Sequence, residues 1–307
     1  MKNLNNNQLL EKMSEIIPKD LIKINEPMKD HTSFKAGGCT DFFIAPQNID
    51  QLIRLVQFLK DNQVPYYIMG NGSNLLVRDK GFRGVIVQIY KNMSGVRIEG
   101  EEVWAEAGIL LSTLSTKVMN SHLTGFEFAS GIPGTLGGAI YMNAGAYDGE
   151  MKQVLVSADV IDEDGNIVTL TNEELKLGYR SSILQEKKYI VLSAKLKLKK
   201  GNIDEIRERI NYLTAQRKAK QPLELPSAGS TFKRPQGYYA GKLIMDAGLR
   251  GYSIGDAQVS EKHCGFVVNK GNASAGDIIR LIHHIQNTVK EKFGVLMEPE
   301  VRIIGEE

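Results

Sequence analysis

The residues best suited to chemistry in this sequence form a turn, Gly70-Asn71-Gly72-Ser73-Asn74, after the short apolar run 66–69. Glycine permits positive φ and lets a ligand come close to the backbone, and successive backbone N–H groups in such a turn can converge on one anion. Ser73 and Asn74 add side-chain donors. We interpret this Gly70 turn (70–74) as a phosphate cradle, and a plain surface turn between two strands is the alternative.

Two better-known phosphate loops do not fit the Gly70 turn or its surroundings. A dinucleotide-binding loop needs a third glycine where this chain has Leu75 and should begin a helix, whereas residues 75–77 are apolar and β-like. A nucleoside-triphosphate loop ends in Gly-Lys-Ser or Gly-Lys-Thr, but Gly241-Lys242 is followed by Leu243 and lacks the upstream spacing. Both interpretations are therefore rejected.

A second glycine-rich stretch spans residues 129–146. Its glycines alternate with apolar residues and it carries almost no charge, whereas a solvated linker would be polar. A backbone packed close to a flat ligand explains this composition better. Two further loops carry polar side chains: Gly178-Tyr179-Arg180-Ser181-Ser182, and residues 226–235 with Ser230, Lys233 and Arg234.

The surrounding pattern predicts alternating short helices and strands that position these loops. Asn48 and Gln51 resemble a capping box before an amphipathic helix that ends by Pro65. Apolar periodicity predicts further helices at 9–17, 111–123, 240–247 and 276–293, and one through 206–213. Alternation and turn signals predict strands at 41–45, 66–69, 85–89, 96–98, 103–107, 154–161, 167–170, 189–199, 265–269 and 300–304.

Composition narrows the class of protein. The chain has 307 residues, 42% hydrophobic and 24% charged, with a formal net charge of +2. There is no basic tract dense enough to bind nucleic acid, no apolar run of about 20 residues for a membrane span, and no apolar secretory signal near the polar start, 1–7. We expect a cytoplasmic protein, and the sequence indicates nothing about its oligomeric state.

The cysteines and histidines indicate no metal site. Cys39 and Cys264 have no partners at metal-ligand spacing, and His283 and His284 are adjacent on a predicted helix and point to different faces. His263 beside Cys264 could form a nucleophile pair, but sequence adjacency is poor evidence of contact.

Five motifs occur in this order: Gly70-Asn-Gly-Ser-Asn, Gly131-Ile-Pro-Gly, Tyr179-Arg-Ser-Ser, Ser227-Ala-Gly-Ser-Thr-Phe-Lys-Arg-Pro and Glu298-Pro-Glu-Val-Arg-Ile-Ile-Gly. Together they closely resemble the UDP-N-acetylenolpyruvoylglucosamine reductase family, flavoenzymes of bacterial peptidoglycan synthesis. The resemblance runs from about His31 to Gly305. The region 199–203 has no room for the inserted tyrosine loop of some members, so the chain looks like the shorter subclass, and what covers the uridine is unassigned.

The resemblance implies an α+β fold with an FAD-binding domain of the vanillyl-alcohol-oxidase type. We expect a helical extension at 1–30, the FAD domain at 31–200 in subdomains of about 31–85 and 86–200, and a substrate-binding domain at 201–307. The Gly70 turn would hold the pyrophosphate, and residues 131–145 would run along the flavin. The expected cofactor contacts are Gly70, Asn71, Gly72, Ser73, Asn74, Ser130, Gly131, Pro133, Gly134, Gly138 and Asn143.

The resemblance also implies that NADPH reduces the flavin, which passes hydride to the vinyl group of UDP-N-acetylglucosamine enolpyruvate. Arg180 would stabilise the resulting negative charge, a protonated Glu300 would hydrogen-bond the enolate oxygen, and Ser230 would supply the proton. Taken singly, each of these three residues is better explained by a structural role, and their joint occurrence in the order of the family favours the catalytic one. The expected substrate contacts are Tyr179, Arg217, Lys218, Lys233 and Arg234. An assisting role in the proton transfer is the alternative for Lys233 and Arg234.

Two rival interpretations remain. An oxidase of a small alcohol or hydroxy acid with the same flavin fold would react rapidly with oxygen. A non-catalytic nucleotide-binding protein would lack flavin, or its flavin would not respond to NADPH.

Overall fold

The computed structural model describes residues 4–307, and residues 1–3 of the polar start lie outside this part. Contacts divide the chain into two compact units, each built from three segments. Unit 1 comprises residues 1–23, 42–71 and 85–216, and unit 2 comprises residues 24–41, 72–84 and 217–307. The chain therefore passes between the two units several times.

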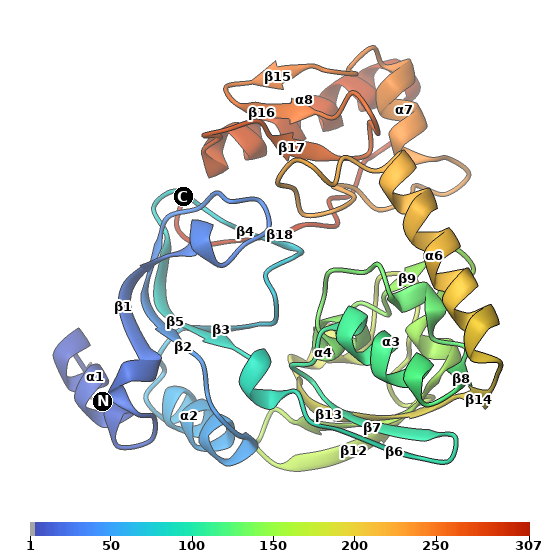
Figure 1. Ribbon diagram of the computed structural model, residues 1–307. Coiled ribbons are helices and arrows are strands. Elements are labelled where there is room, and N and C mark those ends of the chain that lie inside the picture. Colours follow the sequence, from blue (N-terminus) through green and yellow to red (C-terminus); the bar gives the residue numbers. More distant parts are fainter. Residues whose placement is uncertain (1–3) are drawn as a thin grey trace. The chain divides into compact units, whose positions relative to one another are not determined.

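Figure 1 shows the helices and strands with their labels. The α-helices are α1 (Asn6–Ser14), α2 (Ile49–Asp61), α3 (Leu111–Asn120), α4 (Leu136–Tyr141), α5 (Ile183–Lys187), α6 (Ile203–Lys220), α7 (Ala240–Asp246) and α8 (Ala275–Phe293). The longer strands are β1 (Ile22–Pro27), β2 (Cys39–Ile44), β3 (Tyr66–Met69), β5 (Phe82–Gln88), β6 (Val96–Glu99), β7 (Glu102–Glu106), β11 (Leu155–Ile161), β12 (Ile167–Thr171) and β13 (Ile190–Lys197). The shorter strands are β4 (Leu75–Val77), β8 (Leu123–Thr124), β9 (Gly145–Ala146), β10 (Gly149–Glu150), β14 (Lys199–Lys200), β15 (Ser253–Ile254), β16 (Ala257–Val259), β17 (Val267–Asn269) and β18 (Arg302–Ile304).

The core of unit 1 is a five-stranded sheet in the order β12-β11-β13-β7-β6, with α3 and α4 over one face (Figure 1). Both predicted hairpins, β6–β7 and β11–β12, are confirmed as antiparallel pairs. Burial alternates along β7: Val103 and Ala105 face the core, and Trp104 on the other face lies between the cations of Arg97 and Lys195. The period-2 pattern thus fixes which face packs against the helices.

A four-stranded sheet in the order β1-β2-β5-β3 leads into the Gly70 turn. The predicted strand 66–69 is confirmed as β3, which pairs in parallel with β5. Helix α2 connects β2 to β3, and β5 lies between these two strands. The expected capping box forms only in part, because Asn48 Oδ1 accepts from the Gln51 N–H whereas the Gln51 side chain accepts from Gln47 N.

Unit 2 contains the antiparallel sheet β15-β16-β17, with α8 packed against it (Figure 1). Helix α8 begins with a capping box between Ser274 and Asp277 and ends at Gly294, which has φ 69°. Its buried face carries Ile278, Leu281, Ile282, Ile285 and Val289. Gly294 suits this end because positive φ costs glycine little.

The parallel pair β4–β18 explains why residues 72–84 belong to unit 2. Leu75, Leu76 and Val77 are in register with Arg302, Ile303 and Ile304. Strand β4 is buried throughout, so its backbone groups need a partner strand, and the last strand of the chain supplies it. The second half of the Gly70 turn therefore lies in unit 2 and the first half in unit 1.

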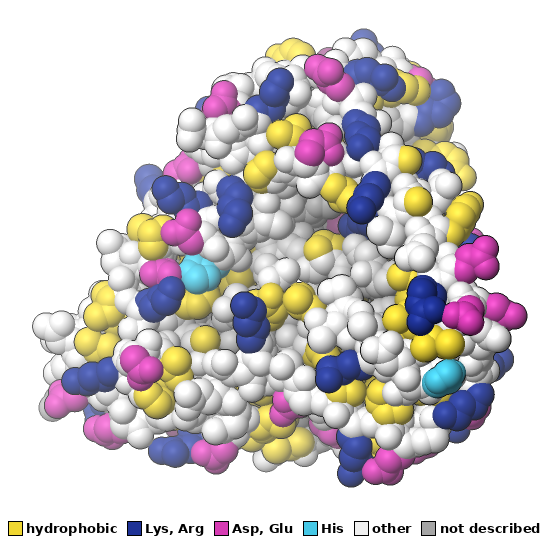
Figure 2. Space-filling model, viewed as in Figure 1, with side chains coloured by type: hydrophobic (Ala, Val, Ile, Leu, Met, Phe, Trp, Pro, Cys, Tyr) yellow, Lys and Arg dark blue, Asp and Glu magenta, His cyan; other side chains and the backbone are white. Residues whose placement is uncertain are grey.

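The part of the chain that the structure describes contains neither a membrane-spanning helix nor a metal-binding cluster. None of the helices in residues 4–307 is long and apolar enough to span a membrane. Within the same residues, no group of three or more His, Cys, Asp or Glu side chains could hold a metal ion. On the face shown in Figure 2, Lys and Arg side chains are interspersed with Asp and Glu.

Candidate active site

The first half of the Gly70 turn packs against the glycine-rich segment (131–145) within unit 1. Asn71 Nδ2 donates to the carbonyl oxygen of Pro133 at 2.8 Å. A Cβ on Gly70 would lie 2.2 Å from Thr135 Oγ1, so only glycine allows this approach. Gln88 Nε2 donates to the carbonyl oxygen of Gly70 at 3.1 Å and fixes the turn from the β5 side. The fold thus brings together the two stretches that the sequence assigns to one cofactor.

The glycine-rich segment has features that fit a bound flat group. Gly138 is exposed, and a Cβ there would meet no heavy atom closer than Thr135 Oγ1 at 3.6 Å, so its backbone borders open space. Gly131 and Gly134 are half-buried, Pro133 is exposed, and Ser130 Oγ donates to the carbonyl oxygen of Glu127. A ligand could therefore lie against this backbone without displacing side chains.

Asn143, a predicted cofactor contact, is buried and its amide is engaged inside unit 1. Its Nδ2 donates to Glu150 Oε2 at 3.1 Å and to the carbonyl oxygen of Gly178 at 3.0 Å, and its Oδ1 accepts from Lys152 N. The bond to Gly178 connects the glycine-rich segment to the Arg180 turn (178–181). Asn143 thus supports the Arg180 turn, a role that the sequence did not predict.

The Arg180 turn is a two-residue turn closed by reciprocal backbone hydrogen bonds between Gly178 and Ser181, of 3.1 and 3.3 Å. Arg180 has φ 53°, in the left-handed region, and its guanidinium lies 5.3 Å from the centre of the Tyr179 ring. Gln185 Nε2 donates to the carbonyl oxygen of Arg180 at 3.1 Å. A positive φ at an arginine is uncommon and is typical of functional sites.

Within unit 2, the chain segment that carries Ser230 is hydrogen-bonded to the segment that carries Glu300, through Thr231. The Glu300 N–H donates to the carbonyl oxygen of Thr231 at 2.8 Å, and Thr231 follows Ser230 in the chain. Asn74 Nδ2 donates to the carbonyl oxygen of Glu300 at 3.1 Å. Ser230 is exposed and Glu300 half-buried, so the side chains of both are accessible.

Asn74 Oδ1 is buried and makes no hydrogen bond within the described chain. A buried acceptor without a donor costs stability, so this atom is suited to a ligand N–H or O–H. Gly72, with φ 66°, and half-buried Ser73 precede it in the same turn. The second half of the Gly70 turn therefore also fits a bound cofactor.

Thr231 and His263 hold the backbone next to Ser230 through hydrogen bonds with Gly265 and Val267. The sequence predicted this role for neither residue. Thr231 N donates to the carbonyl oxygen of Gly265, and its Oγ1 accepts from Val267 N, both at 2.9 Å. The Gly265 N–H donates to His263 Nδ1 at 3.1 Å. Burial lowers the pKa of His263, because the charged imidazolium loses hydration there.

The predicted substrate-binding cations lie in different settings. Lys233 forms an ion pair with Glu298, and the Arg234 guanidinium lies 4.5 Å from the centre of the exposed Tyr239 ring. Arg217 and Lys218 lie in the last turn of α6. An ion pair with one exposed partner is weak, so Lys233 can exchange Glu298 for a ligand phosphate.

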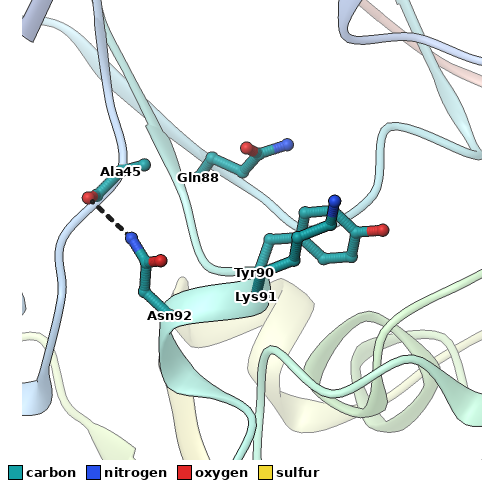
Figure 3. A pocket seen from close by; sticks show the side chains of 5 residues that line it. All are labelled: Ala45, Gln88, Tyr90, Lys91 and Asn92. Carbon is teal, nitrogen blue, oxygen red and sulfur yellow. Dashed lines mark hydrogen bonds between the residues drawn. The ribbon is translucent and has the colours of Figure 1, made fainter. Parts of the chain in front are cut away.

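A pocket of about 150 Å³ in unit 1 is lined by Ala45, Gln88, Tyr90, Lys91 and Asn92 (Figure 3). Asn92 Nδ2 donates to the carbonyl oxygen of Ala45 at 3.3 Å across it. None of the residues predicted for the site lines this pocket. Gln88, which also holds Gly70, connects the pocket to the turn.

Comparison with known proteins defines the class first. The family model described as "FAD binding domain" matches residues 40–171. Wild-type Phl p 4.0202, a glucose dehydrogenase, shares the fold over 63% of this chain and 44% of its own, with a TM-score of 0.51 and 15% identity. The chain is an FAD-dependent oxidoreductase with an α+β fold and an FAD-binding domain of the vanillyl-alcohol-oxidase type.

The family follows from closer relatives. The model of the UDP-N-acetylenolpyruvoylglucosamine reductase C-terminal domain matches residues 221–304. Reductases of that name from Caldanaerobacter subterraneus subsp. tengcongensis and Alkaliphilus oremlandii are 55% and 56% identical, over 97% and 96% of this chain and 98% and 97% of their own. The crystal structure of the Thermus caldophilus reductase, 35% identical, covers 92% of this chain and 97% of its own with a TM-score of 0.79. The chain belongs to the UDP-N-acetylenolpyruvoylglucosamine reductase family.

Proposed function

We propose that this protein reduces UDP-N-acetylglucosamine enolpyruvate to UDP-N-acetylmuramate with NADPH, in the cytoplasm, as a step of peptidoglycan synthesis. The observation that supports the proposal is the backbone hydrogen bond in unit 2 from the Glu300 N–H to the carbonyl oxygen of Thr231, since it holds the residue that follows Ser230 against Glu300. The names and coverage of the relatives support the substrate.

FAD would be held by the Gly70 turn and the glycine-rich segment. The open backbone at Gly138 and the buried acceptor of Asn74 support this assignment. FAD would supply hydride transfer from NADPH to the terminal carbon of the enolpyruvyl group. We propose residues 31–200 as the cofactor-binding part and 201–307 as the substrate-binding part of the chain.

Arg180 would stabilise the negative charge that hydride addition places on the enolpyruvyl group. The charge delocalises into the substrate carboxylate, and a fixed guanidinium beside it lowers the barrier. The positive φ of Arg180 and the hydrogen bonds around its turn support this role, since a strained residue held by several partners is already ordered before substrate binds.

Glu300 and Ser230 would complete the reaction. A protonated Glu300 donates a hydrogen bond to the developing enolate oxygen, and Ser230 Oγ–H gives its proton to the adjacent carbon. The serine alkoxide left behind regains its proton from water, which can reach this exposed side chain. Tyr179, Arg217, Lys218, Lys233 and Arg234 would contact the UDP-sugar, the cations binding its diphosphate.

The first test is an anaerobic visible spectrum of the purified protein. We expect a yellow protein that bleaches with NADPH and regains its colour with UDP-N-acetylglucosamine enolpyruvate. Recolouring in air but not with this substrate would favour an oxidase. A colourless protein that cannot be reconstituted with FAD would exclude the proposed role of the Gly70 turn.

A second test separates the two half-reactions. Replacing Ser230 with Ala should leave flavin reduction by NADPH nearly intact and slow reoxidation by the enolpyruvyl substrate about 10²–10⁴-fold, the usual contribution of a positioned acid. Ser253→Ala is the matched control, because Ser253 is an exposed serine of the same unit. Equal slowing of both half-reactions by Ser230→Ala would make Ser230 a positioning residue.

A further inference from the structure

We propose that Gln185 is a positioning residue that fixes the backbone of Arg180 and thereby the direction of its guanidinium. The proposal rests on the proposed function of Arg180. Gln185 lies in α5, five residues after Arg180, and it is half-buried. No motif in the sequence points to it.

The Gln185 amide joins two backbone carbonyl groups. Its Nε2 donates to the carbonyl oxygen of Arg180 at 3.1 Å and to that of Tyr141, the last residue of α4, at 2.8 Å. An amide nitrogen has two N–H groups, and both are used here. Ser182 Oγ also donates to the carbonyl oxygen of Tyr141, at 2.7 Å. The Arg180 turn is therefore hydrogen-bonded to the end of α4, the helix within the glycine-rich segment.

The position of Arg180 in its turn makes this support necessary. The second central residue of a two-residue turn with φ 53° favours glycine, and an arginine there is strained. The backbone dihedrals at Arg180 set the direction of its Cα–Cβ bond, so holding its carbonyl group restricts where the side chain can point. Without the Gln185 amide, the turn can relax and the guanidinium loses its fixed direction.

The test is Gln185→Met, which keeps the length of the side chain and removes both donors. Gln57→Met is the matched control, because Gln57 is an exposed helical glutamine of unit 1 whose amide bonds a side chain, Asp61. We expect Gln185→Met to retain FAD and to be reduced by NADPH at nearly the normal rate. The saturating rate of reoxidation by the enolpyruvyl substrate should fall about 10- to 100-fold, the range for small misplacements of a catalytic group.

A readout independent of activity is hydrogen exchange of the peptide that contains residues 178–185. It should exchange faster in Gln185→Met, while peptides of the five-stranded sheet stay unchanged. If Gln185→Met does not fold, Gln185→Glu replaces it, since the carboxylate keeps the shape and lacks the donors. A normal reoxidation rate in a folded variant, or equal slowing of both half-reactions with loss of FAD, would overturn the proposal.

A double-mutant cycle with Arg180→Ala separates this proposal from the proposed function. If Gln185 acts through Arg180, Gln185→Met should slow reoxidation little further once the guanidinium is gone. Fully additive effects would overturn the positioning role. If Arg180→Ala itself reoxidises normally, the proposed function of Arg180 fails. If Arg180→Ala is slow and Gln185→Met is normal, only the role of Gln185 fails.

Discussion

The Arg180 turn in unit 1 receives two side-chain donors besides its own backbone bonds, whereas Glu300 in unit 2 is held by a backbone bond to Thr231 and by the Asn74 side chain. Side chains of Asn143 and Gln185 donate to the backbone of the Arg180 turn. In unit 2, Glu300 is joined to Thr231 by a hydrogen bond between their backbones. In both arrangements these hydrogen bonds engage the backbone of residues proposed for catalysis, Arg180 in unit 1 and Glu300 in unit 2.

The difference has consequences for mutation. Side-chain clamps can be removed one at a time, so the Arg180 turn should respond to single substitutions with local changes. Backbone bonds survive most substitutions, and the Ser230–Glu300 pair is vulnerable mainly where a side chain supports that backbone, at Asn74 and Thr231. The predictions that follow probe this contrast.

The largest effect is expected at Arg180. Arg180→Ala should slow reoxidation by the enolpyruvyl substrate about 10²–10³-fold, as for loss of one preorganised charge-stabilising group. Arg180→Gly should be equally slow but about 1 kcal/mol more stable than Arg180→Ala, because it relieves the left-handed strain at some cost in unfolded-state entropy. Single-turnover kinetics and urea denaturation measure the two effects.

Lys188→Gly is the matched control for strain. Lys188 has φ 55°, lies in the same unit and is exposed. It should gain stability to a similar extent with no change in either half-reaction. If Arg180→Gly is less stable than Arg180→Ala, strain is not a feature of the Arg180 turn and the contrast between the two regions is weakened.

An intermediate effect is expected from the two asparagines of the Gly70 turn. Asn74→Ala loses the bond to the carbonyl oxygen of Glu300, which should cost about 1 kcal/mol of unfolding free energy and slow reoxidation. Asn71→Ala loses the bond to Pro133 and should weaken FAD retention instead. FAD content after gel filtration and single-turnover rates distinguish the two. If both variants lost FAD and slowed in reoxidation to the same extent, the two halves of the Gly70 turn would not have separate roles.

The sequence predicted most of the local structure correctly. Strands 66–69 and 75–77, both hairpins of the five-stranded sheet and helix α8 follow from periodicity, caps and turn residues, which act within a few residues. The predicted strand 300–304 is shorter in the structure, at 302–304, because its pairing with β4 begins at Arg302. The motifs also identified the cofactor class and the family.

Long-range support was not predictable from these patterns. The pairing of β4 with β18, the bond of Gln185 to Tyr141 and the bond of Thr231 to Val267 depend on residues that the fold brings together, and their own sequence context gives no signal. Asn143 illustrates the limit, since the family resemblance predicts a cofactor contact for it and the sequence gives no sign that its amide also supports the Arg180 turn. A polar residue in a motif can serve the ligand or the backbone beside it.

The smallest effect is expected from pH, and it should act on unit 2. Burial lowers the folded-state pKa of His263 below its unfolded value of about 6.5, so the unfolded state binds more protons between these two values. This contribution to stability is complete above about pH 6.5 and is lost as the pH falls to the folded-state pKa.

Once His263 is protonated, its Nδ1 can no longer accept a hydrogen bond from the Gly265 N–H. The carbonyl oxygen of Gly265 accepts from Thr231 N, so the loss affects Thr231, whereas the Gln185 amide does not titrate. Protection against hydrogen exchange near Thr231, taken relative to the intrinsic rate at each pH, should therefore fall as the pH drops through the lowered folded-state pKa of His263, while that of residues 178–185 should not. His263→Asn keeps an acceptor and should remove the difference; an unchanged pH response in that variant would assign it to other groups.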